Sequence, residues 1–332
     1  MRLVAHIGLH KTGTTSLQLA MAANRELLGK SGVLYPVAGH IDSGGHLNLV
    51  WEQVSQWKFK PHFGGLSAFV HEVRNTDCDT VILSAESLSG YYNRTEPVEL
   101  VKKLCDDLGT RATIVSTIRP QHTLLDSLYA QNASTGYTDL DFRSYVTKTL
   151  TQRSLELEVL LGRWYESFDD VRLLDVDGNR EKPLIARFLE MCDIEMPAGM
   201  NVLGRANERA TIHTVEYGRY AARVLAGLEV TPAVRHQIIS MVAKLTRARY
   251  PGDPKFSGLD REMAEFLHMH FSERNAQFAT RRLAGIPPFA SDDKPLEKAK
   301  PSFLDLEKAD QEERLTFERI LASAIISTQA QK

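Results

Sequence analysis

The chain has 332 residues, of which 43% are hydrophobic and 25% charged, so it is long enough to bury a large core. Its formal net charge of −2 excludes the broad basic surface that holds nucleic acid or an anionic membrane, and any anion site must therefore be local. No segment approaches the roughly 18 apolar residues of a membrane span, and the first residues do not resemble a signal peptide.

The chain contains only three cysteines, Cys78, Cys105 and Cys192. They are odd in number and lack the spacing of metal ligands, so neither a disulfide framework nor a cysteine-based metal site is expected. We predict thiols in a reducing compartment, a cytoplasmic protein and no bound metal.

Short apolar runs alternate with helical patterns along the first part of the chain. Strands are predicted, in chain order, at residues 3–9, 33–36, 80–84, 112–118 and 171–176. Helices are predicted at residues 15–28, 96–108 and 155–168. Because several of the runs are apolar enough to be buried on both faces, the alternation predicts an α/β fold. Its parallel β-sheet would be flanked by helices, with ligands at the carboxyl ends of the strands.

The second half of the sequence differs in character. Residues 211–270 have mostly helical patterns, and after Gly285 the run IPPFASDDKPLEKAKP is rich in proline and charge, which indicates a linker. Residues 302–326 could form a last amphipathic helix. We therefore expect one α/β domain over residues 1–285, with a helical second half from about residue 211, and then a linker and C-terminal helix over residues 286–332.

The first predicted strand runs into HIGLHKTGTTSLQ, residues 6–18. Gly8 and Gly13 permit close backbone approach, and a following helix would point its unpaired N–H groups at an anion. The spacing of the glycines fits the Walker A pattern, but Thr14 stands where the nucleotide-binding lysine belongs, and Lys11 precedes the second glycine. More hydroxyl groups are present than one helix cap needs; they belong to Thr12, Thr14, Thr15 and Ser16. These features predict a site for an anion with several oxygens.

A strand, the sequence KTGTT and a helix, in this order, resemble the 5'-phosphosulfate loop of the sulfotransferases that use 3'-phosphoadenosine 5'-phosphosulfate (PAPS). The resemblance implies a P-loop-like sulfotransferase fold with PAPS as donor, 3'-phosphoadenosine 5'-phosphate (PAP) as product, and no obligatory metal. It assigns donor binding to the loop residues Lys11, Thr12, Gly13, Thr14, Thr15 and Ser16.

A second motif, ATIVSTIRPQHTLLDSLYAQ, begins with the strand at 112–118. Arg119 follows the strand end, Pro120 suits a first helical turn, and Ser127 lies about two turns along the helix. An arginine followed eight residues later by a serine resembles the 3'-phosphate signature of the same enzymes, because a guanidinium can donate two parallel hydrogen bonds to phosphate oxygens. The alternative is a solvated strand-end charge and a helix-surface hydroxyl.

Sulfuryl transfer to a hydroxyl needs a base for the acceptor proton and positive charge at the leaving oxygen. Glu86 follows the strand at 80–84, where the resemblance places a glutamate or histidine base, and Lys11 would stabilise the leaving group. His46, in the glycine-rich stretch DSGGHLNLVWE, is the next candidate for the base. His10 either stabilises sulfuryl charge beside Lys11 or only packs the loop.

The polar stretch NVLGRANERA, residues 201–210, contains Arg205 and Arg209. In related enzymes a late basic loop closes over the 3'-phosphate, so the resemblance assigns Arg205 to donor binding. A solvated loop residue is the alternative.

The resemblance covers about residues 1–210 and implies a cytoplasmic sulfotransferase that acts on a hydroxyl of a small-molecule or glycan acceptor, a carbohydrate or glycolipid. Two other functions stay open. One is a P-loop kinase with a degenerate phosphate loop, in which Asp175 would hold magnesium. The other is a nucleotide-binding protein without catalytic activity. No sequence pattern identifies the acceptor or the oligomeric state.

Overall fold

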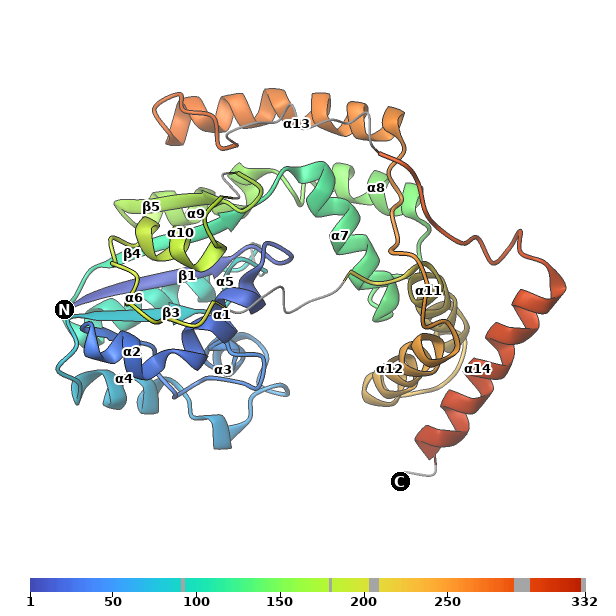
Figure 1. Cartoon of the computed structure of the whole chain (residues 1–332), viewed down its shortest axis with the longest axis horizontal. Helices are drawn as coiled ribbons and strands as arrows, with labels where there is room; N and C mark the ends of the chain where they lie inside the picture. Colours follow the sequence, from blue (N-terminus) through green and yellow to red (C-terminus); the bar gives the residue numbers. More distant parts are fainter. Residues whose placement is uncertain (91–92, 179–180, 203–208, 290–298, 330–332) are drawn as a thin grey trace. The chain divides into compact units, whose positions relative to one another are not determined.

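The computed structural model describes residues 1–90, 93–178, 181–202, 209–289 and 299–329 (Figure 1). The chain divides into two compact units, each made of three segments. Unit 1 comprises Met1–Pro120, Leu155–Asn207 and Phe271–Asp292, and unit 2 comprises Gln121–Ser154, Glu208–His270 and Asp293–Lys332. This division differs from the expected single domain over residues 1–285, because the helices of the second half bury a core of their own.

Unit 1 contains a sheet of five strands, all parallel, in the order β2-β3-β1-β4-β5. The strands are β1 (Arg2–Gly8), β2 (Val33–Leu34), β3 (Thr80–Ser84), β4 (Ala112–Ile118) and β5 (Asp170–Asp175). The predicted α/β class with a parallel sheet is therefore confirmed. β1 is the central strand, so the loop that follows it leaves the middle of the carboxyl edge of the sheet.

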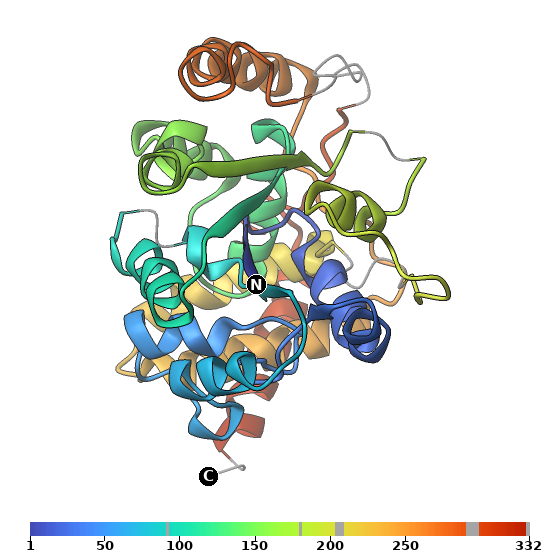
Figure 2. The same cartoon turned by 90° about the vertical axis from the view of Figure 1, so that its left-hand side faces the viewer.

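Helices cover both faces of this sheet (Figure 2). On one face, α1 (Thr14–Ala23) and α10 (Leu184–Met191) pack their apolar sides onto β1 and its neighbours, forming a core that includes Leu17, Met21, Ile185 and Phe188. On the other face lie α6 (Glu96–Leu108) and α9 (Leu157–Ser167). The remaining helices of this part are α2 (Arg25–Lys30), α3 (Leu47–Val54), α4 (Leu66–Arg74), α5 (Ser87–Gly90) and the short 3₁₀ helix η1 (Pro61–Phe63).

The helix predicted over residues 15–28 is broken at Asn24 into α1 and α2. The Asn24 amide donates to the carbonyl oxygens of Ala20 (2.7 Å) and Asn201 (3.0 Å), and its oxygen accepts from the N–H of Asn201 (2.8 Å). The side chain therefore satisfies a carbonyl at the end of α1 and also anchors a segment distant in the sequence.

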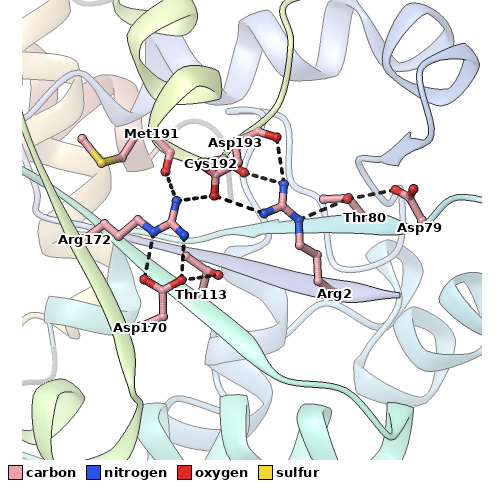
Figure 3. Close-up of polar contacts among 9 residues, drawn as sticks. All are labelled: Arg2, Asp79, Thr80, Thr113, Asp170, Arg172, Met191, Cys192 and Asp193. Atoms are coloured by element: carbon pink, nitrogen blue, oxygen red, sulfur yellow. Dashed lines mark hydrogen bonds and ion pairs between the residues drawn. The ribbon is translucent and has the colours of Figure 1, made fainter.

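At the amino edge of the sheet, two arginines hold the C-terminal end of α10 (Figure 3). Arg172 forms two 2.8 Å bonds with the Asp170 carboxylate and donates to the carbonyl oxygen of Met191 at 2.7 Å. Arg2 donates to the carbonyl oxygen of Cys192 at 2.5 Å. Cations at this position satisfy the last carbonyls of a helix and interact favourably with its dipole.

The long helix α13 (Arg261–Arg282) begins in unit 2 and ends in unit 1. Within unit 1 it forms two ion pairs at the start of α9. Arg274 lies 2.9 Å from the buried carboxylate of Glu156, and Arg282 lies 2.6 Å from the partly exposed carboxylate of Glu158. The last segment of unit 1 is thereby attached to the middle one.

Unit 2 is helical. Besides the first part of α13 it contains α7 (Gln121–Ser134), α8 (Phe142–Thr151), α11 (Ile212–Ala226), α12 (Pro232–Arg249) and α14 (Gln311–Gln329). Helices α11, α12 and α14 share a core that includes Tyr217, Ile239, Phe317 and Leu321. The predicted C-terminal helix at 302–326 thus exists, but it begins later and packs on this unit. Among the described helices of the chain, none is both long and apolar enough to cross a membrane.

Candidate functional site

The loop after β1 approaches the start of α5 so closely that Gly8 has no room for a side chain. Its φ is +84°, and a Cβ there would lie 2.8 Å from the Cβ of Glu86. Glycine at this position therefore brings the end of the central strand against Glu86. From sequence, Gly8 was expected to permit close approach to an anion; the close approach that the structure has is made towards Glu86.

Two further residues of the loop have left-handed backbone conformations. Lys11 has a φ of 63°, and Gly13, with a φ of 81°, is the N-cap residue of α1. Gly13 has no side chain with which to cap α1, and the first turn of the helix contains no acidic residue. The positive end of the α1 dipole therefore lies at this loop, which is the feature on which the predicted anion site depends.

The hydroxyl groups of the loop are placed differently from one another. The Thr12 side chain is fully buried, and its hydroxyl already bonds to the carbonyl oxygen of Leu9 (2.6 Å) and the hydroxyl of Thr117 (2.7 Å). The geometry does not favour the Thr12 side chain as a ligand contact, because its hydroxyl is used to bond the loop to Leu9 and to β4. Thr14 is also buried, whereas Thr15 and Ser16 are partly exposed on the first turn of α1.

Glu86 lies at the centre of a small group of polar side chains. The buried amide of Gln18 on α1 donates to Oε2 of Glu86 at 2.8 Å. The ring of His10 lies over Gly90, where a Cβ would be 2.7 Å from Nε2. Burial lowers the pKa of His10; the charge of Glu86 opposes this lowering and that of Lys11 adds to it.

The structure therefore places His10 near both Lys11 and Glu86, at the ends of β1 and β3; their roles stay predictions. Gln18 was not among the predicted residues. Its signal in the sequence is a polar residue beside Leu17 on the apolar side of a helix, which alone does not reveal a partner on another element.

His46 is fully buried next to the end of β3. Its Nδ1 accepts from the N–H of Ser84 at 3.1 Å, so Nε2 carries the proton and donates to the carbonyl oxygen of Pro36 at 3.0 Å. Burial lowers the pKa of His46 to about 3, and the ring is neutral near pH 7. Nδ1 thus holds the backbone two residues before Glu86, and Nε2 holds the backbone after β2, which favours a positioning role for His46 over that of a base.

Arg119 lies at the end of β4, on the same edge. It donates to the carbonyl oxygen of Lys11 at 3.0 Å and pairs with the Asp177 carboxylate at 2.8 Å. Ser127 lies two turns along α7 as expected, but it belongs to unit 2 and Arg119 to unit 1, so their pairing stays a prediction. Arg205 lies outside the described residues, and Arg209 is hydrogen-bonded to the buried carboxylate of Asp126.

No match was found when the chain was compared with protein-family models, with curated proteins and with solved structures. Within the described residues, no three His, Cys, Asp or Glu side chains are placed to hold a metal ion. The arrangement at the carboxyl edge combines a lysine, a helix N-terminus and an adjacent carboxylate. Such a site can bind an anion and accept a proton from a group beside it.

Proposed function

We propose that this protein is a sulfotransferase that moves the sulfuryl group of PAPS to a hydroxyl of a carbohydrate or glycolipid acceptor. The observation that carries the proposal is the position of Glu86. The backbone of Glu86 lies against Gly8, at the start of the anion loop. Its carboxylate is hydrogen-bonded to Gln18 of α1, the helix that follows this loop. A base beside an anion loop is what transfer from an anionic donor to a neutral hydroxyl requires.

In the proposed reaction the acceptor oxygen forms a bond to sulfur while the bond between sulfur and the bridging phosphate oxygen breaks. The acceptor proton passes to Glu86, and PAP leaves with the bonding electrons on its 5'-phosphate. Lys11 and the α1 N-terminus stabilise that developing charge. Gln18 and His46 act as positioning residues, because Gln18 binds the carboxylate and His46 holds the preceding backbone.

Recognition of the 3'-phosphate falls to Arg119, with Ser127 and Arg205 as further proposed contacts. Arg119 already bonds to the Lys11 carbonyl, so one guanidinium would support the 5'-phosphate loop and contact the 3'-phosphate. All three cysteines are free, in keeping with the cytoplasm as the proposed location.

The test is transfer of label from sulfur-labelled PAPS to fractions of glycans, glycolipids and small phenols. Lys11→Ala should slow both transfer and uncoupled donor hydrolysis, because both need charge on the leaving oxygen. Glu86→Gln should slow transfer about 10²–10⁴-fold, the usual range for loss of a general base, and leave PAP binding nearly unchanged. Glu99→Gln, an exposed glutamate on α6, is the matched control and should have no effect.

Two outcomes would contradict the proposal. If no fraction is labelled and PAP does not bind, the loop serves another anion. If ATP with magnesium phosphorylates an acceptor while PAPS gives no transfer, the kinase alternative is correct. Full activity of Glu86→Gln would place the base elsewhere.

A further inference from the structure

The connection between α3 and α4 presents aromatic and basic side chains on the surface of unit 1. Its sequence, SQWKFKPHF over residues 55–63, contains no acidic residue. Trp57 is 82% exposed, more than any other large hydrophobic residue that the structure describes. The ammonium group of Lys58 lies 4.9 Å from the centre of the indole ring, and that of Lys60 lies 5.9 Å from the ring centre of Phe63.

The backbone of this α3–α4 connection is held firmly. The buried amide of Asn48 donates to the carbonyl oxygens of Lys60 (3.0 Å) and Gly64 (2.7 Å), and its oxygen accepts from the N–H of Lys60 (2.9 Å). Gly39 donates to the carbonyl oxygen of Phe63 at 2.7 Å. The exposed indole therefore sits on a connection with defined hydrogen bonds, not on a frayed end.

Acidic side chains near the two ends of the connection are engaged by other groups. Glu52 accepts from the N–H of Leu66 at 2.7 Å. Arg94 donates to the carbonyl oxygen of Val54 at 3.1 Å, and its ion pair with Glu96 at 2.6 Å adds no net charge. Within residues 55–63 the charged side chains are therefore Lys58 and Lys60, and the Glu52 carboxylate lies beyond the end of this segment, against the N–H of Leu66.

We propose that the α3–α4 connection docks this protein on an anionic lipid surface. Trp57 would lie at the headgroup level, which tryptophan favours because its ring is amphipathic, and Lys58 and Lys60 would face the lipid phosphates. Each lysine near an anionic surface contributes on the order of a fivefold gain in binding. Two lysines and one indole therefore give weak, reversible attachment, which is compatible with a net charge of −2.

The connection also lies on the functional side of the sheet. Gly39, to which it is bonded, follows the carboxyl end of β2, and His46 of the same stretch donates its N–H to the carbonyl oxygen of Ser84, the last residue of β3. The proposed docking concerns binding to lipid alone and does not depend on sulfuryl transfer. Should both hold, a glycolipid is the acceptor favoured among the proposed ones.

The test is co-sedimentation of the full-length protein with vesicles of phosphatidylcholine, with and without phosphatidylglycerol, combined with tryptophan fluorescence. Binding should require phosphatidylglycerol, weaken as salt is added, and shift the emission to the blue. The double variant Lys58→Ala/Lys60→Ala should bind more than about tenfold more weakly. Trp57→Ala should lose most of the blue shift, since Trp164 is buried and Trp51, on α3, is only partly exposed.

Matched controls are Lys30→Ala, with a lysine side chain 68% exposed on α2, and Tyr137→Ala, with a tyrosine 70% exposed, and both should bind like the unaltered protein. Circular dichroism checks the fold of every variant. Absence of binding to anionic vesicles would overturn the proposal. So would binding of Trp57→Ala and of the double lysine variant as tight as that of the unaltered protein. Release of the protein from vesicles by free glycerol phosphate would also overturn it. The same holds for a blue shift of the tryptophan emission with soluble oligosaccharide and no vesicles, because either result indicates a site for a small molecule.

Discussion

Arg119 has three tasks if the proposed function is correct. It pairs with Asp177, it holds the carbonyl of Lys11, and it must contact the 3'-phosphate of the donor. The first of these competes with the third, since a carboxylate and a phosphate require the same donor groups. On the proposed function, Asp177 would therefore tune donor affinity.

Arg119→Ala should weaken PAP binding by about 1.5–3 kcal/mol, the range for a hydrogen bond to a charged group, and adenosine 5'-phosphate binding by much less. Asp177→Asn should leave the adenosine 5'-phosphate affinity unchanged and strengthen PAP binding, because the guanidinium is released from its carboxylate. Calorimetry with both ligands measures the difference. Equal losses for the two ligands in Arg119→Ala would refute the 3'-phosphate role.

At the scale of single residues, sequence was informative about backbone and less so about side chains. The sequence indicates special backbone positions at Gly8 and Gly13, and both have left-handed conformations in the structure; the left-handed conformation of Lys11 was not predicted. The burial of the Thr12 hydroxyl and the bond from Gln18 to Glu86 could not be predicted. Each depends on a partner from another element, brought near only by folding.

At the scale of elements, the arginine pair at the end of α10 makes unit 1 sensitive to acid. The hydrogen bonds from Arg172 lower the pKa of Asp170 below its ordinary value of 3.8. Since the ionised form is the one stabilised in the folded state, this contribution is complete above pH 3.8 and is lost as the pH falls through the lower folded pKa.

Arg172→Met should lower the free energy of unfolding by about 1 kcal/mol at neutral pH, because the pair is half-exposed and screened by solvent. The loss should shrink in acid, at a pH below the lowered pKa of Asp170, where the carboxyl group is protonated. Urea unfolding at both pH values measures it, with Lys182→Met as control for an exposed ion pair. A loss that is the same at both pH values would show that the carboxylate contributes nothing.

The elements themselves could largely be predicted. Strands β3 and β4 and helix α6 have the expected bounds, because continuous apolar runs and an amphipathic pattern are local signals. The break at Asn24 was missed. Its helical spacing fits an unbroken helix, and the reason for the break is Asn201, 177 residues away.

At the scale of the whole molecule, the two units have separate cores and should respond separately to core truncation. Phe317→Ala removes a buried ring from the core of α11, α12 and α14, and Phe188→Ala removes one from the core under the sheet. Each change should cost about 3–5 kcal/mol. Hydrogen exchange measured along the chain should show the loss of protection confined to unit 2 for Phe317→Ala and to unit 1 for Phe188→Ala. Equal loss in both units would mean that they unfold as one.

Sequence patterns could not predict that each unit is made of three separate segments of the chain. Periodicity identifies a helix but not the core that it joins, and α7 follows β4 directly while packing with α11. The expected boundary near residue 285 followed a change in composition, whereas the actual division follows contacts between distant segments.

The pairing of α9 with the end of α13 sets an order of events during synthesis. Arg274 is added 118 residues after Glu156, so at about 5–20 residues per second the ribosome takes roughly 6–24 s to supply it. Until then Glu156 must stay hydrated, because burying a carboxylate without its arginine is costly. The start of α9 is therefore the part of the α/β unit that is completed last as a nascent chain emerges, once the end of α13 has left the exit tunnel.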